Sequence, residues 1–586
     1  MSFIKLDKKK KFIFFLLLSL IIIHILIEKL ICTGDEPTYI YQGLGIFTNL
    51  KFYPSEATWA NFLEKHEFNF FTFGKLDKPR QTIASSLLYG SLLANFNLEI
   101  ARWANFTLGI IGIICLYNLL NSYFNDFKNN NSYFSELTIA SISFSLPLIA
   151  YLKLIYPEVM LMSCITLSLF FINKDKKEEF ELFNQYLSLF FAILLPFIHI
   201  RCLLVSLGLV GFIFASNILN KHQKSKSTDK LQIVIQVILV FLGYSCFVKY
   251  QTYLFGSITG SASAPFSPAI DTFFERLGMQ LFSSQHGLLA YSPILLFGFP
   301  GLIIGCLKKN RLAIQALSLL FLYVITFIWG LASESMTARF WVAAIPFLSI
   351  GLYCWMYYNS KKNFFYLPII PLFIINIINF IFFITSPNSY LENRLNSLTY
   401  IKLFKIIPIN FGLILPSDIT TLGTFGYNQT ITQLLIGTFL LTTIIVISSV
   451  IQYKITYKIL IVLCLIISLS PFFTCYSKVV SSEQYTIFRE ASGNAPACLK
   501  IDFKNNNKIK ALQLINSNSL WIPPNYPTYF KILINNDENI VQEIDKQPVR
   551  NLVTFKKSLK ISSIRLIEEP QTFDSPWLES QITIIQ

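Results

Sequence analysis

Thr33-Gly34-Asp35-Glu36-Pro37-Thr38-Tyr39 sets two adjacent carboxylates directly after the first apolar run of the chain, residues 12–27. Gly34 and Pro37 disfavour a continuing helix, so the first helix is expected to end before the carboxylates. This pattern places negative charge at the mouth of a membrane helix, ahead of a long polar loop. The sequence therefore predicts membrane helices arranged around a site that contains these carboxylates.

The composition supports this class. Of the 586 residues, 53% are hydrophobic and only 14% are charged, whereas a soluble globular chain carries about 25% charged residues. Four lysines at 8–11 precede the first apolar run. No small-x-small cleavage site follows it, so we expect an uncleaved first helix and a multi-pass protein.

Thirteen apolar runs of roughly membrane-helix length follow one another. They predict an all-α polytopic membrane domain of about 13 transmembrane helices. The runs cover residues 12–27, 100–120, 137–152, 159–172, 183–198, 202–216, 231–248, 293–307, 312–330, 340–358, 364–385, 431–451 and 459–473.

The distribution of charge gives an independent test of this count. If the loops alternate sides, the N-terminal tail and the even-numbered loops hold 20 Lys and Arg against 8 Asp and Glu, while the opposite loops hold 15 against 14. Lys and Arg enrichment in short loops marks the cytoplasmic side. The sequence thus predicts a plasma (inner) membrane protein with a cytoplasmic N-terminus. The basic excess reflects topology, so nucleic-acid binding is an unnecessary explanation.

Two domains are expected. Residues 1–475 form the membrane domain, with a first extracytoplasmic loop at 31–99 that carries surface helices. Within that loop, residues 83–96 are apolar but short, which indicates a partly embedded helix. From 476 to 586, apolar and polar residues alternate between clusters of Asn, Pro and Asp. This patterning is typical of strands and turns and predicts an extracytoplasmic β-sandwich-like domain.

Asp35 and Glu36 are the candidate catalytic residues. The hypothesis for these carboxylates is that they serve the transfer of a sugar from a lipid phosphate to a hydroxyl. This reaction needs a carboxylate that accepts the proton of the attacking group. Two adjacent carboxylates repel, which favours a proton on one of them. The structural alternative is an acidic cap on the following surface helix.

Cationic groups must stabilise the phosphate that leaves. The candidates lie at ends of apolar runs on the predicted outer side, where ionisable residues are functional candidates. Glu158 is expected to orient an arginine or the acceptor, and interfacial anchoring is the structural alternative for each cation. The predicted substrate-binding residues are Arg102, Glu158, His199, Arg201 and Arg339, with Lys153 and His286 as weaker members.

These motifs together resemble the GT-C class of polyprenyl-phosphate-sugar-dependent glycosyltransferases, among them protein O-mannosyltransferases and bacterial aminoarabinose transferases. The resemblance spans roughly residues 12–358, and its motifs are short and degenerate. It rests on Gly34-Asp35-Glu36-Pro37, Ala101-Arg102, Tyr156-Pro157-Glu158, the Pro196…His199…Arg201 turn, the stretch 287–293, and Ala338-Arg339-Phe340…Pro346.

The resemblance implies an inverting glycosyltransferase whose first-loop acid acts as base or positions the acceptor. Asp35 matches that acid, Glu36 matches its neighbour, and Arg102 matches the arginine that opens the second helix. The implied partners are a lipid-linked sugar donor, a glycan, lipid or protein acceptor, and membrane lipids. No cofactor is certain; Asp35 and Glu36 could bind a divalent metal ion, but no complete ligand set is visible.

Two other function classes stay open. A transporter or flippase of lipid-linked oligosaccharide would carry ionisable residues at mid-membrane and related halves, and neither is evident here. A polymerase or ligase of surface polysaccharide shares the membrane and the lipid donor, but usually has its large loop late in the chain. A noncatalytic scaffold is a further alternative.

Overall fold

The computed structural model describes the helical part of the chain up to Asn359 in segments and the strands of the tail. The described residues are 8–27, 36–66, 83–124, 133–174, 178–221, 228–256, 288–326 and 339–359, six strands between 485 and 585, and single positions within 273–281 and 373–384.

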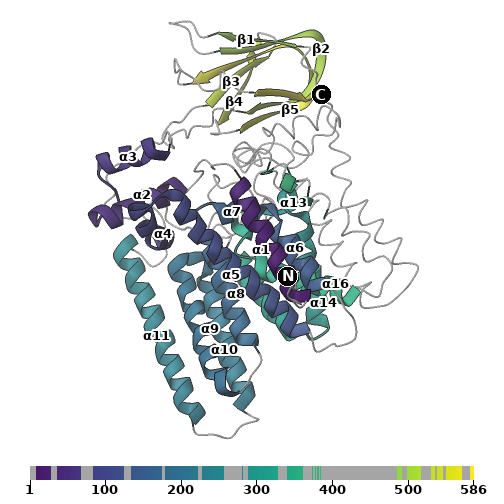
Figure 1. Ribbon diagram of the computed structural model, residues 1–586. Coiled ribbons are helices and arrows are strands. Elements are labelled where there is room, and N and C mark those ends of the chain that lie inside the picture. The colour runs from purple at the N-terminus through teal and green to yellow at the C-terminus, as the bar shows by residue number, and fades with distance from the viewer. Residues whose placement is uncertain are drawn as a thin grey trace, which may run out of the picture.

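The described residues up to Asn359 fold into helices, as the sequence predicts for an all-α domain (Figure 1). Three short helices, α2 to α4, follow the first apolar helix and occupy the predicted outer loop. The helices from the N-terminus are α1 (Lys8–Leu26), α2 (Glu36–Asn49), α3 (Glu56–His66), α4 (Ala84–Asn95), α5 (Leu98–Phe124), α6 (Phe134–Ser143), α7 (Leu146–Lys153) and α8 (Pro157–Asn173).

From Glu178 to Asn359 the described residues continue as helices interrupted by short 3-10 turns. These elements are α9 (Glu178–Ile198), η1 (Ile200–Cys202), α10 (Leu203–Lys221), α11 (Thr228–Phe255), α13 (Leu288–Tyr291), η3 (Pro293–Phe297), α14 (Gly298–Leu307), α15 (Arg311–Ile325), η5 (Arg339–Trp341) and α16 (Ile345–Asn359).

Three of the described helices are long and apolar enough to cross a membrane: Leu98–Tyr123, Glu181–Ile198 and Leu231–Phe255. A fourth span results if α6 and α7, which bend by 56° at their junction, are taken together. The sequence predicted one straight run over 137–152, and the break follows from Pro147 in the first turn of α7, because proline begins helices and interrupts their interiors. The count of thirteen spans stays a prediction, and the runs 431–451 and 459–473 lie outside the described residues.

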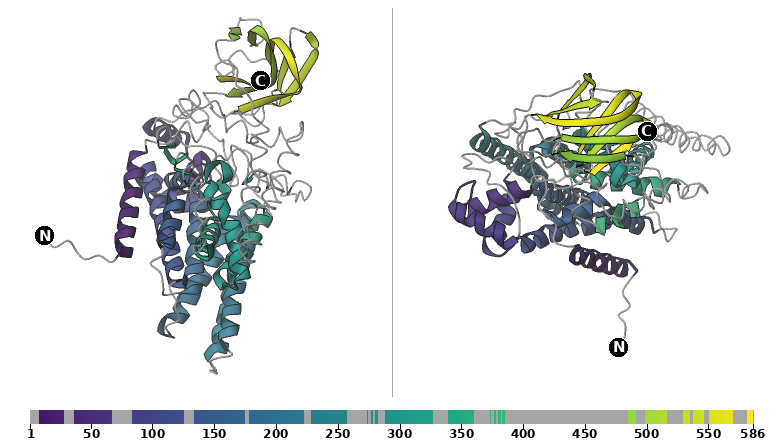
Figure 2. Two further views of the ribbon diagram at one scale, coloured as in Figure 1. Left: turned by 90° about the vertical axis from the view of Figure 1, so that its right-hand side faces the viewer. Right: turned by 90° about the horizontal axis from the view of Figure 1, so that it is seen from above.

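The first helix packs along the outside of the bundle (Figure 2). Its buried side chains, Leu16, Leu20 and His24, recur every four residues and so lie on one face. Phe15 and Ile25 on the other faces are more than half exposed. A helix with an apolar exposed surface of this kind fits a lipid environment.

Glycines allow α14 and α16 to pack closely. A Cβ atom on Gly301 would lie only 1.8 Å from the carbonyl oxygen of Gly351, and one on Gly298 would lie 2.7 Å from that of Leu348. Small residues at such crossings let helix backbones approach, which is how helices associate where lipid removes the hydrophobic driving force.

The tail contains one antiparallel sheet of six strands, in the order β1-β2-β5-β3-β4 with β6 also paired to β2. The alternating sequence pattern predicted strands in this region, and the structure has them; closure into a sandwich stays a prediction. The strands are β1 (Tyr485–Glu490), β2 (Cys498–Ile515), β3 (Tyr529–Ile534), β4 (Asp537–Asp545), β5 (Arg550–Glu569) and β6 (Gln581–Ile585).

Candidate functional site

Glu36 is fully buried at the start of α2, and both of its carboxylate oxygens accept hydrogen bonds. The guanidinium group of Arg102 on α5 donates to Oε2 from Nη2 at 3.0 Å and to Oε1 from Nε at 3.3 Å. The backbone N–H of Ile155, between α7 and α8, donates to Oε1 at 2.8 Å. Charge-assisted bonds from a guanidinium fork are among the strong ones. The carboxylate of Glu36 thus ties α2 to α5 and to the turn that joins α7 and α8.

A second carboxylate, Glu99, links this ion pair to Lys153. Glu99 lies 3.3 Å from Arg102 Nη1 and 3.6 Å from Lys153 Nζ. Lys153 also donates to the backbone oxygen of His24 at 2.9 Å, so the network reaches the end of α1. The two cations and two carboxylates of this network sum to no net charge. It joins α1, α2, α5 and α7 at one end of the bundle, which we call the loop end.

Asn105 supports the same network through hydrogen bonds to the backbone at the end of α7. Its amide Nδ2 donates to the carbonyl oxygens of Tyr151 and Leu154, both at 2.8 Å. Tyr89 on α4 donates to its Oδ1 at 2.7 Å. The last carbonyls of a helix lack i+4 partners within the helix. At the end of α7, the backbone N–H of Leu154 and the Asn105 amide both donate to the Tyr151 carbonyl, and Asn105 also donates to that of Leu154. The side chain therefore holds the segment from which Ile155 reaches Glu36.

Arg339 and Glu158 form the second buried ion pair of the loop end, with Nε donating to Oε1 at 2.6 Å. Arg339 Nη2 also donates to the hydroxyl of Tyr39 on α2 at 3.2 Å. The guanidinium carbon lies 4.4 Å from the ring centroid of Tyr156, a cation–π distance. Glu158 Oε2 is buried and has no hydrogen-bond partner among the described residues.

Arg201 brings a further guanidinium to this second pair. It lies 4.1 Å from the ring centroid of Phe340 and interacts electrostatically with Arg339 and Glu158. Within the described part of this group, two guanidinium groups thus face one carboxylate. Arg339 is buried and Arg201 is half-buried. An excess of positive charge that is largely removed from water is costly unless an anion compensates it, so this arrangement is suited to binding one.

His199 precedes Arg201 in the same turn, η1, and its Nδ1 accepts the backbone N–H of Arg201 at 3.2 Å. Burial and the guanidinium groups of Arg201 and Arg339 lower the pKa of the imidazole well below its usual value. The ring is therefore neutral at physiological pH.

The structure brings the predicted residues together in two groups. Arg102 lies with Glu36, whereas Glu158, His199, Arg201 and Arg339 lie together, and Tyr39 bridges the groups through α2. Asp35 and His286 lie outside the described residues. Arg102 was predicted to bind substrate. In the structure its guanidinium group forms ion pairs with Glu36 and Glu99, and the residue is only 1% exposed.

Sequence reasoning missed Tyr39, Glu99 and Asn105. The signal was helical spacing: Tyr39 follows Glu36 by three residues, and Glu99 and Asn105 flank Arg102 by three. Residues three apart share a helix face, so each missed side chain points to the same side as a predicted one.

The described residues contain no group of three or more His, Cys, Asp or Glu that could hold a metal ion. Glu36 already accepts bonds at both oxygens from Arg102 and Ile155. The arrangement around Glu36 therefore fits an ion pair better than a metal site.

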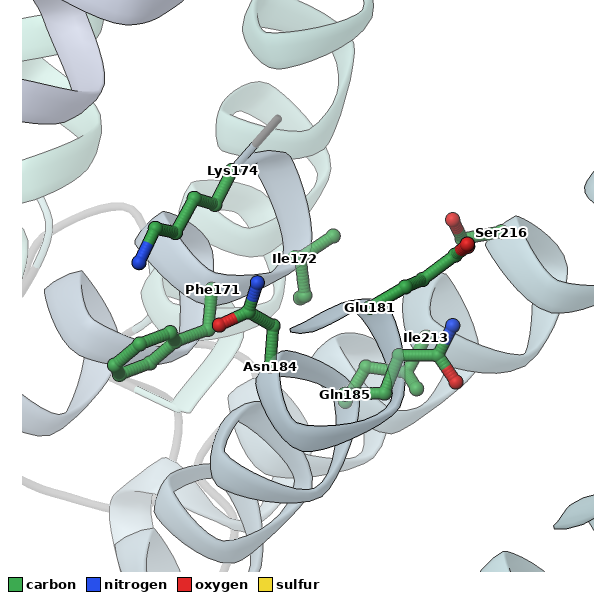
Figure 3. A pocket seen from close by; sticks show the side chains of 8 residues that line it. All are labelled: Phe171, Ile172, Lys174, Glu181, Asn184, Gln185, Ile213 and Ser216. Carbon is green, nitrogen blue, oxygen red and sulfur yellow. The ribbon is translucent and has the colours of Figure 1, made fainter. Parts of the chain in front are cut away.

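A small cavity of about 20 Å³ lies at the opposite end of α8, between α8, α9 and α10 (Figure 3). Lys174, Glu181, Asn184 and Gln185 line it together with apolar side chains. A volume of this size holds about one water molecule. It is separated from the loop end by the length of α8 and belongs to no part of the candidate site.

No protein-family model, curated protein or solved structure matches this chain in the comparisons.

Proposed function

We propose that this protein is an integral-membrane glycosyltransferase that moves a sugar from a polyprenyl-phosphate donor to an acceptor hydroxyl on the extracytoplasmic side. The observation that carries the proposal is that the half-buried Arg201 and the buried Arg339 both act on Glu158, the one carboxylate of this group among the described residues, at one end of apolar helices. A lipid-linked phosphate presents its negative charge at that depth of a membrane, because its chain holds it in the bilayer.

The proposed reaction is a displacement at the anomeric carbon. The acceptor oxygen attacks that carbon, the bond from carbon to phosphate oxygen breaks, and the configuration inverts. Asp35 is the proposed general base, which takes the acceptor proton during attack. The polyprenyl phosphate leaves with the bonding electrons, and Arg201 and Arg339 stabilise its charge.

The buried ion pairs suggest a different role for Glu36 and Arg102. Both are occupied by one another, by Ile155 and by Glu99, so we assign them to positioning. They fix the start of α2 at Glu36, the residue that follows Asp35 in the chain. The proposal also includes the thirteen spans, a cytoplasmic N-terminus and an extracytoplasmic tail that closes as a β-sandwich.

The test uses membranes that contain the wild type or Asp35→Asn, supplied with a panel of radiolabelled polyprenyl-phosphate sugars. The wild type is expected to release label from one donor, and Asp35→Asn is expected to release none while inserting normally. Glu64→Gln is the matched control, because Glu64 is an exposed carboxylate of the same loop, on α3. An active Asp35→Asn variant would remove Asp35 as the base.

The cation site is tested by Arg201→Ala and Arg339→Ala. Each is expected to weaken donor use by about ten- to hundredfold, because a charge-assisted hydrogen bond contributes roughly 1.5–3 kcal/mol. Arg311→Ala is the matched control at the other end of the bundle, where Arg311 is exposed. If no donor is turned over and lipid-linked oligosaccharide instead crosses the bilayer of proteoliposomes, the transporter alternative replaces the proposal.

A further inference from the structure

The tautomer of His199 follows from one hydrogen bond. The backbone N–H of Arg201 donates to Nδ1 at 3.2 Å, so Nδ1 carries a lone pair. In a neutral imidazole the other nitrogen then carries the proton. His199 therefore presents Nε2–H as a hydrogen-bond donor and has no lone pair left for accepting a proton at that atom.

The surroundings keep the ring neutral and leave that donor available. Arg201 and Arg339 both act on the imidazole electrostatically and oppose a positive charge on it. His199 is half-buried, and its one hydrogen bond among the described residues is the one at Nδ1. A donor that lies beside this cationic group and has no acceptor among the described residues is placed to bind an anionic oxygen.

We propose that His199 binds the phosphate group of the lipid-linked donor through Nε2–H, as a neutral ligand beside Arg201 and Arg339. The identity of the ligand rests on the proposed function, whereas the tautomer does not. His199 then adds a directed hydrogen bond to the charge that the two arginines supply. It does not act as a general base or as a cationic phosphate ligand.

Two substitutions separate the nitrogens. In His199→Asn the amide oxygen replaces Nδ1 and keeps the turn that Arg201 closes, but no donor reaches the position of Nε2. In His199→Gln the amide nitrogen replaces Nε2, while the acceptor for the Arg201 N–H is lost. A purely structural His199 would tolerate Asn and suffer from Gln; a phosphate ligand gives the opposite order of binding.

The binding probe is dodecylphosphoglycerol, a phosphodiester of the same charge type as the donor, titrated into purified protein in nanodiscs. Thermal unfolding of each variant, recorded alongside, reports its folding. We expect His199→Asn to unfold like the wild type and to bind about tenfold more weakly, the loss of one hydrogen bond to a charged group. His199→Gln is expected to retain more binding than His199→Asn where it folds. Equal binding by the wild type and His199→Asn overturns the ligand role.

The tautomer is read separately, without any ligand, from ¹⁵N spectra of protein labelled at its five histidines. The signals that disappear in His199→Asn are expected to show a neutral ring protonated at Nε2 between about pH 6 and pH 8. An imidazolium or an Nδ1-protonated ring in that range overturns the inference. If the tautomer is as expected but the wild type binds no probe, the proposed phosphate site is wrong and the ligand role of His199 falls with it.

Discussion

At the scale of single residues, the contacts of Glu36 decide which role we assign to it. Glu36 is fully buried and accepts three hydrogen bonds from Arg102 and Ile155. A buried carboxylate that is hydrogen-bonded at both oxygens is shielded from an acceptor substrate. This is why we assign proton transfer to Asp35 and positioning to Glu36.

We expect Glu36→Gln to lower the stability of the protein by about 3 kcal/mol, because it removes the buried carboxylate partner of Arg102 and leaves the partly exposed Glu99 to balance the guanidinium. A double variant, Glu36→Gln with Arg102→Met, should recover part of this loss, since it removes the stranded guanidinium. Thermal unfolding in detergent measures both. A Glu36→Gln protein of unchanged stability that transfers no sugar would instead make Glu36 catalytic.

The half-buried neutral ring of His199 predicts a pH dependence of stability. Its pKa is lowered in the folded protein, so below the unfolded value of about 6.5 the unfolded chain binds a proton that the folded chain does not. Stability therefore falls with decreasing pH, by roughly 1 kcal/mol from this group between about pH 6.5 and 5.5. His199→Asn lacks this loss. On acidification the unfolding midpoint of the wild type should therefore fall below that of His199→Asn, and a difference that does not change with pH would contradict the assignment.

At the scale of elements, short interruptions bring the site together. The bend between α6 and α7, the extended residues between α7 and α8, and the turn η1 each end or begin a helix at the loop end. Asn105 donates to the Tyr151 and Leu154 carbonyls at the end of α7. Helix ends supply polar backbone groups to the site, and one buried amide keeps them in place.

The close crossing of α14 and α16 leaves little room for added side-chain volume. Gly301→Ala would place a methyl group 1.8 Å from a backbone oxygen of Gly351, so the helices must separate. We expect a loss of about 1–3 kcal/mol, typical of overpacking. Gly211→Ala in α10 is the matched control, because no atom lies within 4 Å of the added carbon. Unfolding midpoints compare the two; equal values would contradict the observed crossing.

At the scale of the whole molecule, charge separates the two ends of the bundle. The buried ion pairs gather at the loop end, while Lys308 and Lys309 are exposed at the turn between α14 and α15, and Lys8–Lys11 begin α1. Positively charged short loops face the cytoplasm. The loop end should therefore face outward.

Cysteine labelling tests this orientation in a background without the native cysteines. Glu64→Cys on α3 is expected to react with an impermeant maleimide in intact cells, and Lys309→Cys only after the cells are opened. Both positions are exposed in the structure, so reactivity reports the side of the membrane. The reverse pattern would place the loop end in the cytoplasm and remove the extracytoplasmic site.

The sequence alone predicted a membrane protein, and it determined the helical character of the described first part of the chain and the residue types that gather at the loop end, because apolar runs are local properties. It predicted two sets of candidates, catalytic and substrate-binding: Asp35 and Glu36 in the first, and Arg102, Glu158, His199, Arg201 and Arg339 in the second. Only the tertiary structure decided their pairing: Arg102 meets Glu36 across 66 residues and Arg339 meets Glu158 across 181. Such partners depend on how helices cross and where they break, and local sequence does not contain that information.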